Sequence, residues 1–131
     1  MTKGQPRANR KPNPLAVSAG YRQFVLDQLE AVGDVTARSM FGGVGLYHHS
    51  DFFGIIADDT LYLKVDDTTR PAYITQGMRP FDPYRGRGAT FQYYEVPLEV
   101  LESAPELARW AKAAIEIARR RAEVDRAKPP G

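Results

Sequence analysis

Hydrophobic positions near the start of the chain repeat at the spacing of a helix. Apolar residues recur every three to four positions, at Tyr21, Val25, Leu29 and Val32. Ser18 precedes them and belongs to the residue types that cap helix N-termini. Gly33 follows at the position where a glycine commonly ends a helix. The pattern predicts a helix between Ser18 and Gly33.

From residue 37 to residue 65 the pattern changes to short apolar runs. The first run, from Met40 to Tyr47, is interrupted by glycines 42, 43 and 45, and glycines inside a strand usually mark bulges or bends. The second run covers Phe52–Ala57, and the third covers Leu61–Val65 with alternating apolar and mixed positions. Turn-forming residues separate these runs. Three strands with short links predict an antiparallel meander.

The second half of the chain alternates between helical and extended patterns. We expect a short helix ending near Gln76, an irregular or edge strand at residues 78–84, a strand from Phe91 to Val96 and a helical turn at residues 98–102. A final helix starts near Pro105, and its apolar stripe should dock Trp110 against the meander. The sequence therefore predicts an α+β fold of two layers. It has an antiparallel sheet of about five strands with helices on one side, in the order α-β-β-β-α-β-β-α.

Composition points to one domain without disulfides. The chain has 131 residues, of which 43% are hydrophobic and 26% charged, as in an ordinary globular domain. Residues 1–14 carry four basic residues, three prolines and no acid, which predicts a disordered basic arm before a domain at residues 15–126. Residues 127–131 are expected to be a disordered tail. The absence of cysteine and of any signal-peptide or membrane-spanning pattern favours a cytoplasmic location and no membrane contact.

Few residues suggest catalysis or metal binding. The glycines at 42, 43 and 45 match neither the dinucleotide loop nor the P-loop pattern. His48 and His49 are the only histidines, and adjacent side chains on a strand point to opposite faces, so we expect a surface turn there and no metal site. Asp58 and Asp59 fall where a hairpin must turn. We expect no cofactor, no catalytic residues and no enzymatic activity.

Other residues suggest an interaction surface. Arg85 and Arg87 lie close in sequence to several aromatic residues, a mixture of cations and stacking surfaces that can bind polyanions. The arginines at 109 and 119–121 form a second basic stretch, although solubilising charges are the simpler explanation. A pocket near Arg38, Tyr62 and Lys64 is a third candidate. The predicted interaction residues are Arg38, Tyr62, Lys64, Arg85, Arg87, Tyr93 and Tyr94.

Several motifs together resemble one known family. They begin with Arg38-Ser-Met-Phe-Gly-Gly-Val-Gly-Leu-Tyr47 and continue through Phe53–Lys64, Gly77–Phe81, Tyr93–Pro97 and Leu107–Trp110. In this order and spacing they resemble the TfoX N-terminal domain, over approximately residues 18–120. The resemblance implies a two-layer α/β fold and a link to the regulation of natural competence. Full-length regulators of that family act with the cyclic-AMP receptor protein and carry a second, C-terminal domain, so we expect a stand-alone N-terminal domain here.

Three functional hypotheses follow. The first is a non-enzymatic regulatory or adaptor domain that binds a protein partner or a second copy through exposed aromatic residues or an open sheet edge. We expect that edge in the meander, along Phe52–Ile56 or Leu61–Val65. The alternatives are direct nucleic-acid binding through the basic arm and the last helix, and an unrecognised small-ligand-binding protein or enzyme.

Overall fold

The computed structural model describes residues 15–40, 42–83 and 89–127 of the chain. The predictions for residues 1–14, for Arg85 and Arg87, and for the tail beyond residue 127 lie outside these residues. Along the chain the elements are α2 (Ala19–Gln28), β1 (Val35–Met40), β2 (Gly43–His48), β3 (Asp51–Ala57), β4 (Thr60–Lys64), α3 (Arg70–Thr75), β5 (Pro80–Phe81), β6 (Thr90–Glu95), α4 (Leu98–Leu101) and α5 (Ala104–Ala127).

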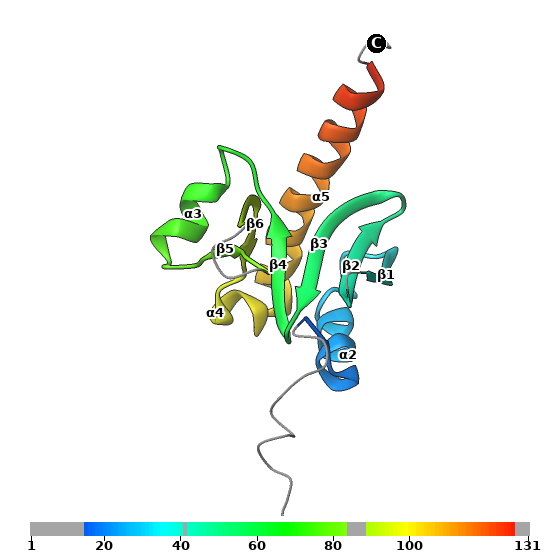
Figure 1. Cartoon of the computed structure of the whole chain (residues 1–131), viewed down its shortest axis with the longest axis vertical. Coiled ribbons are helices and arrows are strands. Elements are labelled where there is room, and N and C mark those ends of the chain that lie inside the picture. Colours follow the sequence, from blue (N-terminus) through cyan, green and yellow to red (C-terminus); the bar gives the residue numbers. More distant parts are fainter. Residues whose placement is uncertain (1–14, 41, 84–88, 128–131) are drawn as a thin grey trace, which may run out of the picture.

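The strands form one antiparallel sheet in the order β1-β2-β3-β4-β6-β5 (Figure 1). Strands β1 to β4 are joined by consecutive hairpin turns. Strand β6 pairs with β4, and β5 pairs with the other side of β6 and forms the edge of the sheet. The predicted α+β fold with an antiparallel sheet is confirmed. The sheet has six strands, close to the predicted number, and the additional strand is β1, which precedes the glycine-rich run and shares only Met40 with it.

The glycines of this run allow two strands to turn and approach closely. Gly42 connects β1 to β2 with a φ of +82°, in the left-handed region that glycine adopts without strain. Within β2, a Cβ at Gly45 would lie 2.7 Å from Met40 Sδ, so a side chain there would displace its neighbour. The irregularity of this hairpin region lies elsewhere, at a register shift between Leu46 and Tyr47. The glycines therefore mark a turn and a close contact, where the sequence suggested bulges.

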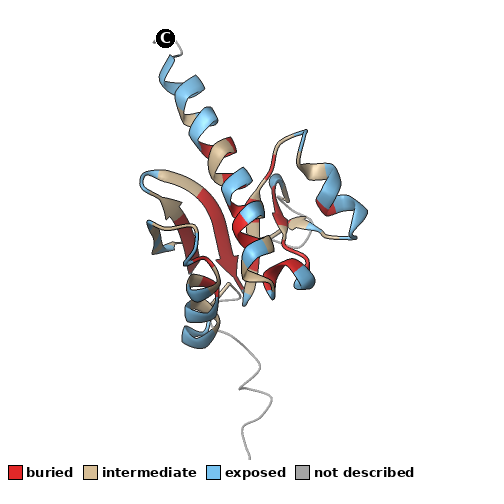
Figure 2. Cartoon of the chain, turned by 180° about the vertical axis from the view of Figure 1, so that it is seen from behind, coloured by how far each residue is buried: buried red, intermediate tan, exposed pale blue. Residues whose placement is uncertain are grey.

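One face of the sheet lies under the helices. Figure 2, which views the molecule from behind, shows α5 crossing this face over the buried strands. The main core contains buried residues from every described helix, including Val25 of α2, Tyr73 of α3, Val100 of α4 and Leu107 of α5, and also Leu29 at the C-cap of α2. Small residues on α5 (Ala111, Ala114 and Ala118) are buried and let the helix approach the strands closely. Past Ala118, α5 has no buried residue and its last turns extend beyond the sheet (Figure 1).

Trp110 packs against this core, as predicted, but its closest ring partner is on a helix. Its ring meets Tyr73 of α3 edge-on at 4.7 Å between centroids. Tyr73 in turn lies 6.1 Å from Tyr94 of β6. The side chain of Trp110 is therefore linked to the sheet through Tyr73, and it stays partly exposed.

Among the described residues no helix crosses the opposite face of the sheet, and Figure 1 views the molecule from that side. The second half of α5 borders one end of this face, where Phe52, Lys64 and Tyr93 line a hollow together with Ala118 and Ala122. A second, smaller apolar cluster lies on this face, formed by Ile55, Ala57, Phe81 and Tyr93. Leu15, Phe52 and Tyr62 pack against it and are partly exposed. We refer to the strand residues that point to this side as the helix-free face.

The open edges of the sheet differ from the prediction. The sequence placed an edge at Phe52–Ile56 or Leu61–Val65, but these residues belong to β3 and β4, which have neighbours on both sides. That prediction is wrong, because β6 pairs with β4 and moves the edge to β5. The other edge strand is β1.

Local turn chemistry follows the sequence closely. Ser18 caps α2, where its Oγ accepts a hydrogen bond from the Tyr21 N–H at 3.2 Å. Asp58 and Asp59 form the β3–β4 turn with left-handed φ values of +51° and +49°. Asp59 Oδ1 also accepts a hydrogen bond from the Ser18 N–H at 2.8 Å, which joins this turn to the start of α2.

None of the helices among the described residues combines the length and the apolar character needed to cross a bilayer.

Candidate functional site

Strand pairing arranges the side chains of the helix-free face in rows across the sheet. One row follows the register through Arg38, Gly45, Ile55, Tyr62 and Glu95. The next row contains Tyr47, Phe52, Lys64 and Tyr93. Alternate residues of a strand share a face, so residues far apart in sequence meet here on one surface.

Aromatic rings form a continuous band along the second row. The ring of Phe52 lies 5.2 Å from Tyr47 on one side and 5.6 Å from Tyr93 on the other, both in tilted geometry. A second pair, Tyr62 and Phe81, meets edge-on at 5.0 Å. Tyr47, Phe52 and Tyr62 are partly exposed, so the band presents aromatic surface to the outside.

Two cations rest on rings of this band. The guanidinium of Arg38 lies 4.9 Å from the centroid of Tyr47. The Lys64 ammonium lies 4.7 Å from the centroid of Tyr93 and donates a hydrogen bond to its hydroxyl at 3.3 Å. Such contacts contribute roughly 0.5–1 kcal/mol at exposed sites. Arg38 and Lys64 therefore flank the aromatic band with positive charge.

Burial alters the ionisation of both partners at the Lys64 end. The pKa of Lys64 is lowered, mainly because partial burial disfavours the ammonium and secondly because Arg121 repels it, while Asp125 opposes the shift. Burial raises the pKa of the Tyr93 hydroxyl to about 12. At neutral pH the tyrosine is a neutral hydrogen-bonding group, and the ammonium of Lys64 is less well solvated than it would be in water.

A model of the TfoX N-terminal domain family matches residues 27–118. The chain belongs to the TfoX N-terminal domain family. No curated protein matches it. The matched segment starts inside α2, ends inside α5 and includes all six strands, so the helix-free face lies within it.

In this TfoX N-terminal domain, four of the predicted interaction residues share the helix-free face: Arg38, Tyr62, Lys64 and Tyr93. Tyr94 lies on the other side, because it follows Tyr93 on the same strand, and it is 5% exposed in the main core. Arg85 and Arg87 are outside the described residues. Sequence analysis missed Tyr47 and Phe52, because only the pairing of β2, β3 and β6 shows that their rings meet Tyr93.

The arginines of α5 in the TfoX N-terminal domain are paired with acids of the same helix. Arg109 contacts Glu106 at 2.7 Å, Arg120 contacts Glu116 at 3.3 Å and Arg121 contacts Asp125 at 3.4 Å. Arg119 is held between Glu116 and Glu123. A phosphate that approached this stretch would therefore have to compete with carboxylates already in place.

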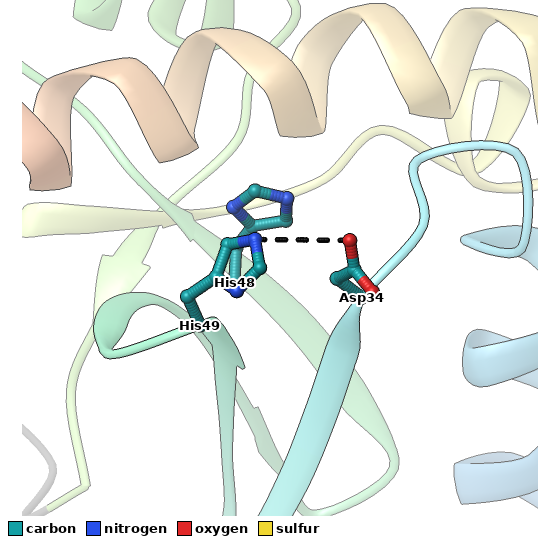
Figure 3. Close-up of side chains that lie close together, drawn as sticks. All are labelled: Asp34, His48 and His49. Atoms are coloured by element: carbon teal, nitrogen blue, oxygen red, sulfur yellow. Dashed lines mark ion pairs between the residues drawn. The ribbon is translucent and has the colours of Figure 1, made fainter.

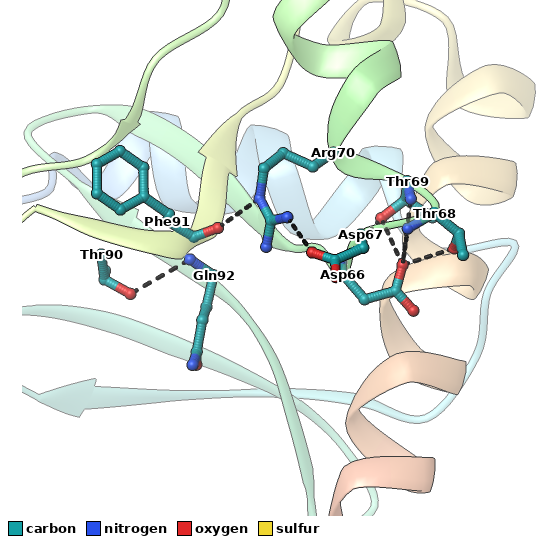
Figure 4. A network of polar contacts seen from close by, with 8 residues as sticks. All are labelled: Asp66, Asp67, Thr68, Thr69, Arg70, Thr90, Phe91 and Gln92. Atoms are coloured by element: carbon teal, nitrogen blue, oxygen red, sulfur yellow. Dashed lines mark hydrogen bonds and ion pairs between the residues drawn. The ribbon is translucent and has the colours of Figure 1, made fainter.

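A polar network fixes the loop between β4 and α3 (Figure 4). Asp66 Oδ1 accepts hydrogen bonds from the Thr68 and Thr69 backbone N–H groups, and the bond from the Thr68 hydroxyl contributes most to lowering the pKa of this carboxyl. Arg70 pairs with Asp67 at 2.6 Å and donates to the Phe91 carbonyl at 2.9 Å. The network joins this loop to β6 and accounts for its polar residues as structural ones.

Beside this loop lies an open hollow of about 330 Å³. It is bounded by the β4–α3 loop and the second half of α5, with Lys64, Arg70 and Arg121 among its lining residues. Asp66 and Asp67 line it too, so positive and negative groups alternate around it. The hollow therefore presents no uniform charge to a ligand, and the helix-free face remains the better candidate for binding.

Proposed function

We propose that this chain is a non-enzymatic regulatory domain that binds a protein partner through its helix-free face. The observation that carries the proposal is the partly exposed aromatic band flanked by Arg38 and Lys64. Tyrosine, phenylalanine, methionine and arginine are enriched in the cores of protein interfaces, and all four occur here. The ionisable groups of the face are spread over neighbouring strands, which suits a broad contact better than the convergent geometry of a catalytic site.

The charge of the band indicates the chemistry of the partner. Arg38 and Lys64 rest on rings and, among the described residues, form no ion pair with a carboxylate. A carboxylate would also favour the ammonium of Lys64, whose pKa burial lowers. We therefore expect a partner segment that places aromatic or aliphatic side chains on the band and acidic residues beside these two cations.

Membership of the family supports a regulatory setting for this contact. We propose that the domain takes part in transcriptional or competence regulation in the cytoplasm, and that it does so through protein contacts. Direct nucleic-acid binding is the weaker alternative, because the arginines of α5 are engaged by acids of their own helix.

Site-specific photo-crosslinking in the native cell tests where a partner binds. A photoreactive residue replaces Tyr47 on the helix-free face or, as the control, Arg126 on the exposed end of α5. We expect a discrete protein adduct from position 47, its loss when Arg38→Glu is added, and no such adduct from position 126. Equal adducts from both positions, or persistence of the adduct with Arg38→Glu, would contradict the proposed face.

The crosslinked partner, once purified, allows a quantitative test by calorimetry. Arg38→Glu and Lys64→Glu should each weaken binding by about tenfold or more, as expected for charged residues beside an interface core. Arg126→Glu is the matched control, because Arg126 is an exposed arginine at the end of α5 and lines none of the hollows that Lys64 borders. Equal losses in all three variants would indicate a general effect of charge and would exclude this surface as the binding site.

A further inference from the structure

Three side chains with metal-binding atoms meet at the turn that follows β2 (Figure 3). They are Asp34, His48 and His49, and their ligand atoms all lie within 4.8 Å of one another. His49 Nε2 is 3.7 Å from Asp34 Oδ2, and the two imidazole centroids are 4.5 Å apart. We refer to these residues as the His–Asp triad.

The backbone explains why the two histidines converge. The sequence suggested that adjacent histidines on a strand would point apart, but only His48 is in the strand. His49 adopts a φ of +56° in the turn, which ends the alternation and returns its ring to the side of His48. Val35 pairs with His48, so the preceding residue, Asp34, arrives at the same place with a φ of +56°.

His49 lies in the left-handed region of the backbone. Residues other than glycine are uncommon at positive φ, although asparagine, aspartate and histidine are enriched there, so the conformation fixes the direction of the ring and does not by itself indicate a function. Glycine would form the turn at lower cost, and the side chain of His49 is 67% exposed, so packing does not account for the residue. The imidazole is therefore accessible to a ligand from solvent.

We propose that the His–Asp triad binds a divalent transition metal ion of the zinc type. Two imidazoles and one carboxylate suit Zn²⁺, Ni²⁺ or Cu²⁺, whereas Mg²⁺ and Ca²⁺ prefer oxygen ligands alone. Bound ligand atoms lie about 3.3 Å apart around a tetrahedral zinc ion. The exposed side chains of Asp34 and His49, at 72% and 67%, are free of close packing and can rotate to reach that spacing. Three protein ligands leave one or more positions for water or for a partner's side chain.

The surroundings set the strength of the site. A hollow of about 370 Å³ lies between the turn and α5, lined by both histidines, Asp51, Lys112, Glu116 and Arg119. The carboxylates of Asp51 and Glu116 favour a cation, whereas Lys112 and Arg119 oppose it. Arg119 is itself held between Glu116 and Glu123, which reduces its effect.

Calorimetric titration of the tag-free chain with ZnCl₂ and NiCl₂ tests the site. The chain has two histidines and no cysteine, so no other imidazole or thiolate can account for binding. We expect one ion per chain with micromolar affinity, no comparable binding of Mg²⁺ or Ca²⁺, and chemical shift changes at both imidazoles. His48→Ala and Asp34→Asn should each weaken binding at least about tenfold. Asp27→Asn, an exposed carboxylate on α2, is the matched control and should leave binding unchanged.

His49→Gly separates the role of the ring from that of the turn. Glycine adopts the left-handed conformation without strain, so this variant should fold with a thermal midpoint no lower than that of the parent. It should nevertheless lose metal binding at least about tenfold. Parent-like binding by His49→Gly, equal affinities of Asp34→Asn and Asp27→Asn, or no binding of Zn²⁺ below millimolar concentration would each overturn the proposal.

Discussion

Burial keeps several tyrosine hydroxyls protonated well above neutral pH. It raises the pKa of Tyr21 and of Tyr93 to about 12, and it raises that of Tyr73 further. An unfolded tyrosine titrates near 10, so the folded state holds these protons more tightly than the unfolded state does. Their contribution to stability is complete below about pH 10 and is lost as the pH rises through the folded pKa values.

Alkaline unfolding should therefore depend on single tyrosines. We expect the free energy of unfolding to fall between about pH 10 and 12, measured by urea denaturation at fixed pH values. Lys64 acts in the opposite direction and at lower pH, because its lowered pKa lets the unfolded state bind more protons only below the ordinary value of 10.5. Tyr73→Phe removes one raised group and should make the fall shallower. An unchanged slope in this variant would show that the buried hydroxyl of Tyr73 does not contribute.

The structural roles of single residues were predictable where they depend only on neighbours in the sequence. Ser18 and the pair Asp58-Asp59 performed the capping and turn roles that their residue types indicate. The position of His49 was not predictable, because one left-handed φ value determines it and the residue types of the turn do not show which of them adopts that value. The His–Asp triad also needs Asp34, which reaches it only through the pairing of β1 with β2.

At the scale of elements, α5 divides into a packed half and an exposed half. Its buried residues run from Leu107 to Ala118, and beyond them the helix is lined by paired charges such as Arg121 and Asp125. Pairs of this kind each contribute about 0.3–0.5 kcal/mol, so the second half is supported mainly by its own helix. The two halves should respond differently to truncation of a large side chain.

Trp110→Ala should destabilise the protein by about 3 kcal/mol, the lower end for a large aromatic residue, because Trp110 is partly exposed. The loss reflects its contact with Tyr73 and the main core. Val124→Ala is the control on the exposed half, where the side chain is 55% exposed, and it should change stability by less than about 0.5 kcal/mol. Urea denaturation of both variants measures the difference. Similar losses in the two would mean that the second half of α5 is docked as firmly as the first.

The positions of the helices were predictable, although α2 ends at Gln28 and not at Gly33, whereas part of the strand order was not predictable. The apolar stripe of α5 and the cap of α2 are local patterns that identify their elements. The return of β6 beside β4 depends on pairing between residues about thirty positions apart, such as Lys64 and Tyr93, and no local pattern encodes it. The expected edge at β3 or β4 was therefore wrong, and the aromatic band became evident only in the structure.

At the scale of the molecule, the arrangement of the helix-free face bears on self-association. β1 is an edge strand, and Arg38 lies near its middle with an exposed side chain. Centred antiparallel pairing of β1 with a second copy would bring two Arg38 side chains close together. Like charges opposite each other on paired strands are destabilising, and charged residues commonly protect open edges.

We therefore expect the chain to sediment as a monomer at concentrations up to about 100 μM, and Arg38→Leu to shift it towards a dimer. Sedimentation velocity at several concentrations measures both. Arg126→Leu is a suitable control, because Arg126 is an exposed arginine in the last turn of α5 and does not lie on the edge strand. A parent dimer that Arg38→Leu weakens would show that the face receives a second copy instead of another protein.

The exposed half of α5 has a geometric consequence for attached groups. Each residue of an α-helix advances about 1.5 Å and turns about 100° around the axis. A reporter domain joined in helical phase at Ala127 would thus keep a defined direction relative to the packed half of α5. Adding one residue at a time to that junction would rotate the reporter in known steps around the axis, while the distance to the sheet grew only slightly. A fluorescent reporter attached at this helix end would therefore have a known direction. Energy transfer from the reporter to a labelled partner could then be used to measure how the bound partner is oriented.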